Sequence, residues 1–218
     1  KIVKAQRIAE DAFLHILDFI TPDRTEIDVA LELEFYMRSH GAEATSFDTI
    51  AVSGSASSLP HGVPRPVKLE KGFFTMDFGA LYEGYCSDMT RTVVLGKADD
   101  EMKKIYNTVL TAQLAAIEKL AVGVTGKETD KVARDIIYGA GYEGCFGHGL
   151  GHGVGMDIHE APSNSAAGIK PFEIGHVITV EPGIYIEGKY GVRIEDMVIF
   201  DENGAQNITK SPKNLIEL

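Results

Sequence analysis

Cysteine, positive charge and long apolar runs are all scarce in this sequence, and each shortage excludes a class of protein. The 2 cysteines, Cys86 and Cys145, provide no disulfide framework, so a reducing compartment is expected. No apolar run approaches the ~20 residues that a membrane helix needs, and the chain opens without a signal-peptide pattern. We therefore expect a cytoplasmic protein with no membrane partner.

The shortage of positive charge narrows the partners further. Lysine and arginine number 21 against 32 aspartates and glutamates, which gives a net charge of −11 at pH 7. This charge disfavours nucleic acid as a partner. With 218 residues, of which 44% are hydrophobic, the chain can bury a core, and we expect one domain over residues 1–218. A homodimer and a monomer both stay open.

One order of elements is present twice, with helical stripes followed by strand-like segments in each half. The first half has expected helices at 1–20 and from Thr25 to near Gly41, then strands at 47–52 and 73–95. The second half has expected helices from Asp99 or Asp100 to about Val122 and at 127–138, then strands within 145–200. This repetition predicts an α+β fold of two pseudo-twofold halves with antiparallel sheet.

Two aspartates bracket the first pair of strands. The segments 73–78 and 85–94 are expected to form a hairpin, and folding the chain about the Tyr82–Glu83 bond places Asp77 directly opposite Asp88. Facing carboxylates destabilise a hairpin unless a positive charge lies between them. Two solvated acids beside a turn are the alternative, but in FFTMDF the Asp77 carboxylate would be buried among apolar side chains. We therefore expect a cation between them.

Two glutamates bracket the corresponding pair of strands in the second half. The segments 176–180 and 192–200 are β-branched and apolar, as sheet interiors are. Placing Glu181 opposite Glu195 centres the connection on Gly188, which requires an odd loop or a bulge. On the second strand Arg193 and Glu195 share one face. Arg193 is therefore either a site residue or one half of a plain ion pair with Glu195.

Three histidines lie between these pairs, in the run FGHGLGHGVGMDIHE: His148, His152 and His159. The alternate glycines disfavour a helix and indicate close backbone approach around a site. Four carboxylates beside an imidazole repel one another without cations, so we expect two divalent metal ions that balance their charge. Oxygen ligands with one imidazole favour Mn²⁺, with Co²⁺, Fe²⁺ and Zn²⁺ as alternatives.

The motifs resemble those of a known family. The segments LPHG, MDFGALYEGYCSDMTRT, FGHGLGHGVGMDIHE, ITVEPGIYI and GVRIEDMV are similar to those of the pita-bread metallopeptidases, peptidase family M24, which include methionine aminopeptidase, aminopeptidase P and prolidase. HGLGH, VEPGIYI and RIED are more similar to the proline-specific branch. The resemblance implies the pita-bread (creatinase/aminopeptidase) fold. Proline-specific relatives usually carry an N-terminal domain, which we expect to be absent here because the chain opens inside a helical pattern. Disorder of that segment is the alternative.

The resemblance also implies the metal ligands. Asp77 would bind one metal ion, His152 and Glu181 would bind the other, and Asp88 and Glu195 would bridge the two. Glu181 would in addition be the general base.

The remaining roles come from the same resemblance. His159 would stabilise the tetrahedral intermediate, and His61 would contact the substrate carbonyl or the leaving group. His148 and Arg193 would shape the substrate site, and Tyr185 would brace it. Two of these residues have plain alternatives, because LPHGVP is also typical of a surface loop and Tyr185 of a packed strand aromatic.

The implied activity is hydrolysis of an N-terminal Xaa-Pro bond by a water activated between two metals, in short peptides with proline at the second position. Whether the substrate is a dipeptide or a longer peptide stays open. Methionine aminopeptidase is the alternative enzyme. A non-catalytic binding module of the same fold and a metal-independent amidinohydrolase resembling creatinase are disfavoured, because all five ligand positions hold competent residues.

Overall fold

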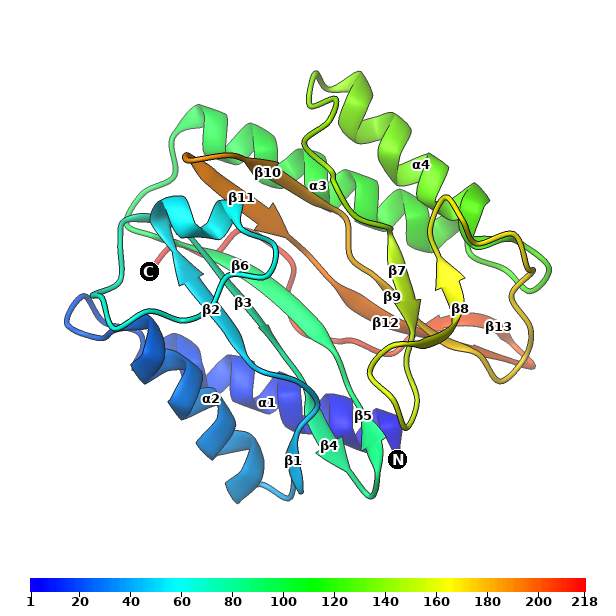
Figure 1. Ribbon diagram of the computed structural model, residues 1–218, viewed down its shortest axis with the longest axis horizontal. Coiled ribbons are helices and arrows are strands. Elements are labelled where there is room, and N and C mark those ends of the chain that lie inside the picture. The colour runs from blue at the N-terminus through cyan, green and yellow to red at the C-terminus, as the bar shows by residue number, and fades with distance from the viewer.

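Helices lie on two opposite flanks of the molecule, with antiparallel strands between them (Figure 1). The computed structural model describes residues 1–218. Helices α1 (Ile2–Phe19) and α2 (Glu26–Ser39) form one flank, and α3 (Asp100–Lys119) and α4 (Gly126–Gly139) form the other. None of these helices combines the length and apolarity that crossing a bilayer requires. The predicted repetition of two helices followed by strands is confirmed.

The second helix of each half begins at a capping box. Thr25 Oγ1 accepts a hydrogen bond from the Asp28 N–H (3.1 Å), and the Asp28 carboxylate accepts one from the Thr25 N–H (2.8 Å). In the second half Thr125 and Glu128 exchange the same pair of bonds. Each cap satisfies backbone donors that the first helical turn cannot satisfy itself. The second box places the start of α4 at Gly126, one residue before the predicted start.

The strands form four antiparallel groups. A three-stranded sheet has the order β2-β3-β6 (Ile50–Ser53, Gly72–Phe78, Met89–Leu95). A five-stranded sheet has the order β13-β12-β9-β7-β8 (Gly204–Asn207, Asp196–Asp201, Val177–Val180, Gly151–Gly153, Glu160–Asn164). The two smaller groups are β10-β11 (Gly183–Ile186, Tyr190–Arg193) and β1-β4-β5 (Ala44–Thr45, Ala80–Tyr82, Tyr85–Cys86). A 3₁₀ helix spans Gly54–Ser58.

The two helical flanks pack against different apolar clusters. Helices α1 and α2 pack with Phe74, Met76 and Phe78 of β3, whereas α3 and α4 pack with a second cluster that includes Ile178 and Val180 of β9. Successive side chains of a strand point to opposite faces. The face of β3 that carries Asp77 is therefore turned away from α1 and α2, towards the second half.

The register of the first hairpin corrects the prediction for Asp77. This residue pairs with Thr90, not with Asp88. The turn consists of Glu83 and Gly84, both with positive φ (48° and 75°), as in a two-residue hairpin turn of the primed type. Its centre lies one residue beyond the predicted one, so Asp88 is a diagonal rather than a direct neighbour of Asp77.

The second hairpin has the predicted register. Gly183 pairs with Arg193, and Ile186 pairs with Tyr190, which leaves an odd loop centred on Gly188. Gly188 has a φ of 69°, a value that favours glycine. Val180, the last residue of β9, pairs with Asp196, the first residue of β12. Glu181, directly after β9, therefore lies opposite Glu195, directly before β12.

Residues near the C-terminal end of the chain cover the edge strand of the first half. The Val94 N–H of β6 donates to the Ile216 carbonyl (2.8 Å), and the Leu218 N–H donates to the Val94 carbonyl (2.8 Å). The Glu217 carboxylate accepts from the Ala98 N–H (2.8 Å). The two halves are therefore connected by backbone pairing as well as by the chain between them.

Candidate metal centre and active site

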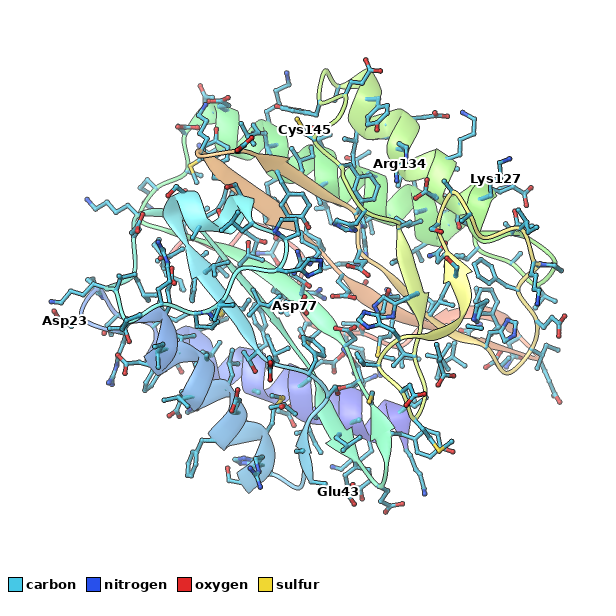
Figure 2. The ribbon with its side chains drawn as sticks, viewed as in Figure 1. Asp23, Glu43, Asp77, Lys127, Arg134 and Cys145 are labelled. Atoms are coloured by element: carbon cyan, nitrogen blue, oxygen red, sulfur yellow. The ribbon has the colours of Figure 1, made fainter.

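A cavity of about 730 Å³ collects the predicted site residues from both halves. Its lining includes the five predicted metal ligands, Asp77, Asp88, His152, Glu181 and Glu195, together with His61, His148, His159 and Arg193. Tyr185 is hydrogen-bonded to His148 and Arg193 behind this lining. Asp77 lies at the centre of the molecule, between the helical flanks (Figure 2). Residues separated by more than half of the sequence thus meet in one place.

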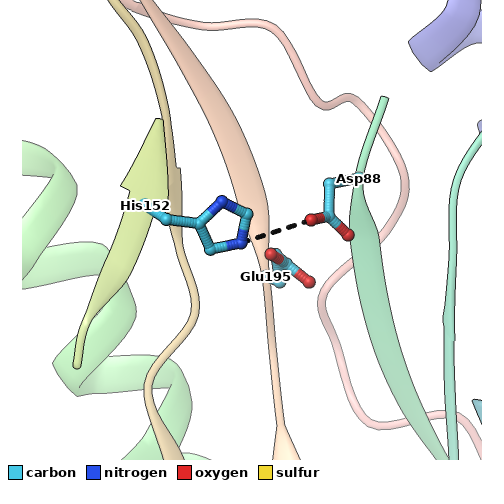
Figure 3. Close-up of side chains that lie close together, drawn as sticks. All are labelled: Asp88, His152 and Glu195. Carbon is cyan, nitrogen blue, oxygen red and sulfur yellow. Dashed lines mark ion pairs between the residues drawn. The ribbon is translucent and has the colours of Figure 1, made fainter. Parts of the chain in front are cut away.

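Asp88, His152 and Glu195 belong to the lining of this cavity and point towards one another (Figure 3). Each offers one ligand atom, and these atoms all lie within 4.8 Å of one another. His152 Nε2 is 3.5 Å from Asp88 Oδ2 and 3.4 Å from Glu181 Oε1. His152 Nδ1 lies 3.0 Å from the Gly153 carbonyl, which can only accept, so Nδ1 carries the proton. Nε2 then offers its lone pair to the cluster.

Two carboxylate oxygens in the cluster lack any partner. Asp77 Oδ1 and Asp88 Oδ1 are buried and make no hydrogen bond. An unpaired buried acceptor costs about 1–3 kcal/mol, and more when it is charged. A cation between the two residues would satisfy both oxygens. The residues present therefore fit a divalent metal ion.

Burial opposes ionisation of the carboxylates in this cluster. Burial is the larger cause and the charge of Glu195 the next, and together they raise the pKa of Asp88 well above its ordinary value. Burial, and then the charge of Glu181, does the same to the pKa of Glu195. Burial raises the pKa of Glu181 to about 8 and lowers the pKa of His152 to about 4. Cations nearby favour the charged carboxylates and the neutral imidazole, which are the ligand forms.

Two threonines that sequence reasoning missed orient the glutamates. Thr90 Oγ1 donates to Glu195 Oε2 (2.6 Å), and Thr179 Oγ1 donates to Glu181 Oε1 (3.2 Å). Thr179 Oγ1 also accepts from the His152 N–H (3.0 Å). The available signal was spacing, because Thr179 precedes Glu181 by two residues. Side chains two apart on a strand share a face.

A chain of hydrogen bonds connects His148 to Asp77 through Tyr185 and Arg193. His148 Nε2 lies 2.9 Å from the Tyr185 hydroxyl, to which Arg193 Nη1 donates at 2.7 Å. Arg193 Nη2 donates to Asp77 Oδ2 at 2.6 Å. Its ion pair is therefore with Asp77 of the first half, and the alternative of a plain pair with Glu195 is wrong.

The two remaining histidines line the cavity from different directions. His159 lies edge-on to the ligand His152, with ring centroids 4.2 Å apart. His61 comes from the loop between the 3₁₀ helix and β3, on the first half. The cavity is thus bordered by imidazoles from both halves. His61 is exposed and lies in a turn, so the surface-loop alternative stays open beside the predicted role.

Comparisons with known proteins agree with this arrangement. Residues 1–202 match the model of metallopeptidase family M24. The uncharacterized peptidase YqhT of Bacillus subtilis is 53% identical over 216 residues, which are 99% of this chain and 61% of that protein. The Xaa-Pro dipeptidase of Pyrococcus furiosus is 46% identical over 99% of this chain and 62% of its own length.

Solved structures show the same likeness. The Xaa-Pro dipeptidase from Bacillus anthracis matches with a TM-score of 0.97 at 51% identity, over 100% of this chain and 61% of that one. The X-Pro aminopeptidase from Thermotoga maritima matches with a TM-score of 0.97 at 45% identity, over 100% of this chain and 62% of that one. The chain thus spans about three fifths of the length of these relatives. It belongs to metallopeptidase family M24 and has the pita-bread fold predicted from its motifs.

Proposed function

We propose that this domain hydrolyses the bond between an N-terminal residue and a following proline, with two divalent metal ions as cofactors. The observation that carries the proposal is the convergence of four carboxylates and His152 on one cavity, where Asp77 Oδ1 and Asp88 Oδ1 have no partner within the protein. Similarity to proteins named Xaa-Pro dipeptidase and X-Pro aminopeptidase supports the substrate class.

The ligands of the two ions would be divided between the halves. Asp77 would bind one ion, His152 and Glu181 the other, and Asp88 and Glu195 would bridge them. This oxygen-rich set with one imidazole favours Mn²⁺. When bound, the ions would polarise the scissile carbonyl and make a water a nucleophile near neutral pH.

Glu181 would carry the proton in this reaction. Its carboxylate lines the cavity and is oriented by Thr179. It would accept a proton from the attacking water and deliver it to the proline nitrogen as the bond breaks. His159, beside His152, would donate a hydrogen bond to the oxygen on which negative charge develops. His61 would contact the substrate carbonyl or the leaving group from the opposite wall.

The His148–Tyr185–Arg193 chain would form the wall against which the proline lies. Proline has a fixed φ and its nitrogen carries no amide proton when it is in a peptide bond. A wall whose side chains are already hydrogen-bonded to one another suits a rigid ring that offers no such donor. Short peptides with proline at the second position would therefore be the substrates.

We also propose that the protein works in the cytoplasm. Both cysteines are free, which supports a reducing compartment.

The test is cleavage of the Ala–Pro bond by protein that has been stripped with a chelator and resupplied with Mn²⁺, measured as free proline from Ala-Pro and as Pro-Ala from Ala-Pro-Ala. Cleavage of the dipeptide alone would assign a dipeptidase, and cleavage of both peptides, or of the longer one alone, would assign an aminopeptidase. Cleavage of Met-Ala-Ser but not of Ala-Pro would overturn the proposal in favour of methionine aminopeptidase. An Asp88→Asn variant that keeps full activity would contradict the metal-ligand assignment.

A further inference from the structure

The segment that carries His148 and His152 has little rigidity of its own. Glycine occupies alternate positions from Gly147 onwards, and Gly144 just before has a φ of 79°. Glycine loses more conformational freedom on ordering than any other residue. Two histidines on such a backbone can be placed accurately only if something outside the segment fixes it.

Helix α4 supplies this support through Asp130 and Arg134. Arg134 Nη1 donates to the Phe146 carbonyl (2.8 Å), and Nη2 donates to the His148 carbonyl (2.9 Å). Asp130 Oδ1 accepts a hydrogen bond from the Leu150 N–H (3.0 Å). The helix thus binds the backbone of the segment at three alternate residues.

The two supporting side chains are themselves fixed. Arg134 donates to both carboxylate oxygens of Asp130, through Nε and Nη2 at 2.9 Å each, and Asp130 is only 2% exposed. The guanidinium carbon lies 4.3 Å from the centroid of the Phe146 ring. The planar fork of arginine makes all these contacts at once, which the single ammonium group of lysine cannot do.

The supported segment lies directly against the reacting groups. The Cys145 carbonyl accepts from the Tyr185 N–H (2.9 Å), and the Leu150 carbonyl accepts from the Glu181 N–H (2.7 Å). His148 Nε2 is 2.9 Å from the Tyr185 hydroxyl. Arg134 itself lies on α4, well apart from Asp77 at the centre of the molecule (Figure 2). Its hydrogen bonds towards the site end on the backbone carbonyls of Phe146 and His148.

We propose that Asp130 and Arg134 are positioning residues of the active site, which hold His148 against Tyr185 on the side of the cavity where the substrate proline would lie. The catalytic consequence rests on the proposed function, whereas the support of the backbone does not. Neither residue touches the substrate.

The same helix offers a matched control. Lys131 and Asp135 form an ion pair of the same spacing one position along (2.6 Å), but both side chains are exposed. Neither residue contacts the glycine-rich segment. Loss of this pair tests what an ion pair contributes to α4 without any support of His148.

The experiment compares Arg134→Lys and Asp130→Asn with Lys131→Met and Asp135→Asn. Each variant is measured for kcat and KM on Ala-Pro, for bound Mn²⁺, and for backbone hydrogen exchange in residues 146–150. We expect the first two variants to lose about 10–100-fold in kcat/KM, as loss of an outer support commonly does, with metal content unchanged and faster exchange in this segment. The two control variants should stay within about twofold of the parent.

A double-mutant cycle with His148→Ala decides whether the effect passes through His148. In that background Arg134→Lys should cost less than about twofold, because interacting residues are not additive. An equal loss in both backgrounds, or unchanged exchange and activity in the single variants, would overturn the proposal.

If Arg134→Lys does not fold, Asp130→Asn combined with Arg134→Gln leaves no unpaired buried charge and takes its place. If the parent cleaves no Xaa-Pro peptide, the proposed function fails, while hydrogen exchange still tests the support.

Discussion

Glu26 is a fully buried carboxylate that lies outside the metal cluster and anchors the loop of His61. It is 0% exposed, and it accepts hydrogen bonds from the Ser53 N–H (2.7 Å), the Arg65 N–H (2.9 Å) and Arg65 Nε (2.9 Å). Burial alone would raise the pKa of this carboxyl. The hydrogen bonds from Arg65 and Ser53 outweigh burial and keep the pKa of Glu26 below its ordinary value of 4.5.

The sign of this shift gives a prediction for Glu26→Gln. Because the pKa is lower in the folded than in the unfolded chain, the carboxylate stabilises the protein above its unfolded pKa, and this contribution is lost as the pH falls through the folded pKa. We expect the parent to exceed the variant in free energy of unfolding by on the order of 2–3 kcal/mol near neutrality. The difference should narrow between about pH 5 and pH 3. Urea denaturation of both proteins across this range measures it, and a difference that does not change with pH would contradict the assignment.

At the scale of elements, the sequence predicts what is encoded locally. The helix expected from Thr25 to near Gly41 begins at Glu26 and ends at Ser39, because the residues that start and end it lie within this short stretch of sequence. The loop centred on Gly188 was predicted from the positions of Glu181 and Glu195 alone, and the observed register has the same centre. The first hairpin was misplaced because Glu83, a residue with a side chain, takes a positive φ, which sequence patterns rarely indicate.

The supports of the site were beyond prediction for a different reason. Arg134 donates to backbone carbonyls in another segment, and any residue type has a carbonyl, so no sequence pattern marks the partner. Thr90 meets Glu195 only after the two halves pack together. The ligand types were visible in the sequence, whereas the contacts that orient them depend on the tertiary structure.

Substitution of the two glycines at the ends of α4 allows the effect of helix propensity on stability to be measured apart from the effect of packing. A Cβ on Gly126 would lie 2.2 Å from the Ser163 carbonyl oxygen, whereas one on Gly139 would meet nothing within 4 Å. We expect Gly139→Ala to raise the free energy of unfolding by about 0.4–1 kcal/mol and Gly126→Ala to lower it by about 1–3 kcal/mol. Equilibrium denaturation of the two variants gives the answer. If both variants are more stable than the parent, the Ser163 carbonyl moves away from the added Cβ at position 126 with no loss in free energy of unfolding.

At the scale of the whole molecule, the candidate metal centre lies between the two halves. Asp77 and Asp88 belong to the first half, and His152, Glu181 and Glu195 to the second. A bound ion would therefore stabilise the packing of one half on the other, in addition to any role in the reaction. A ligand that binds the folded chain but not the unfolded chain raises the free energy of unfolding by about 2.7 kcal/mol when its concentration is a hundred times Kd.

Metal removal should accordingly lower the melting temperature. For a chain of this size each kcal/mol corresponds to roughly 2–4 °C, so a chelator is expected to lower Tm by about 5–10 °C. Calorimetry with parallel metal analysis measures this shift, and readdition of Mn²⁺ should reverse it. Asp88→Asn serves as the control, because it should bind less metal and show little response to the chelator. An unchanged Tm in stripped parent protein would show that the ions do not join the halves.

The pairing of residues 216–218 with β6 has a consequence for synthesis. The ribosome releases β6 long before it makes Ile216 and Leu218, and domains generally begin to fold while the remainder is still being translated. Until then one edge of the first sheet presents unpaired N–H and C=O groups, which are sites for wrong strand pairing. The first half cannot finish folding before the second half has been made, so during translation the nascent chain carries an open sheet edge that molecular chaperones would have to protect.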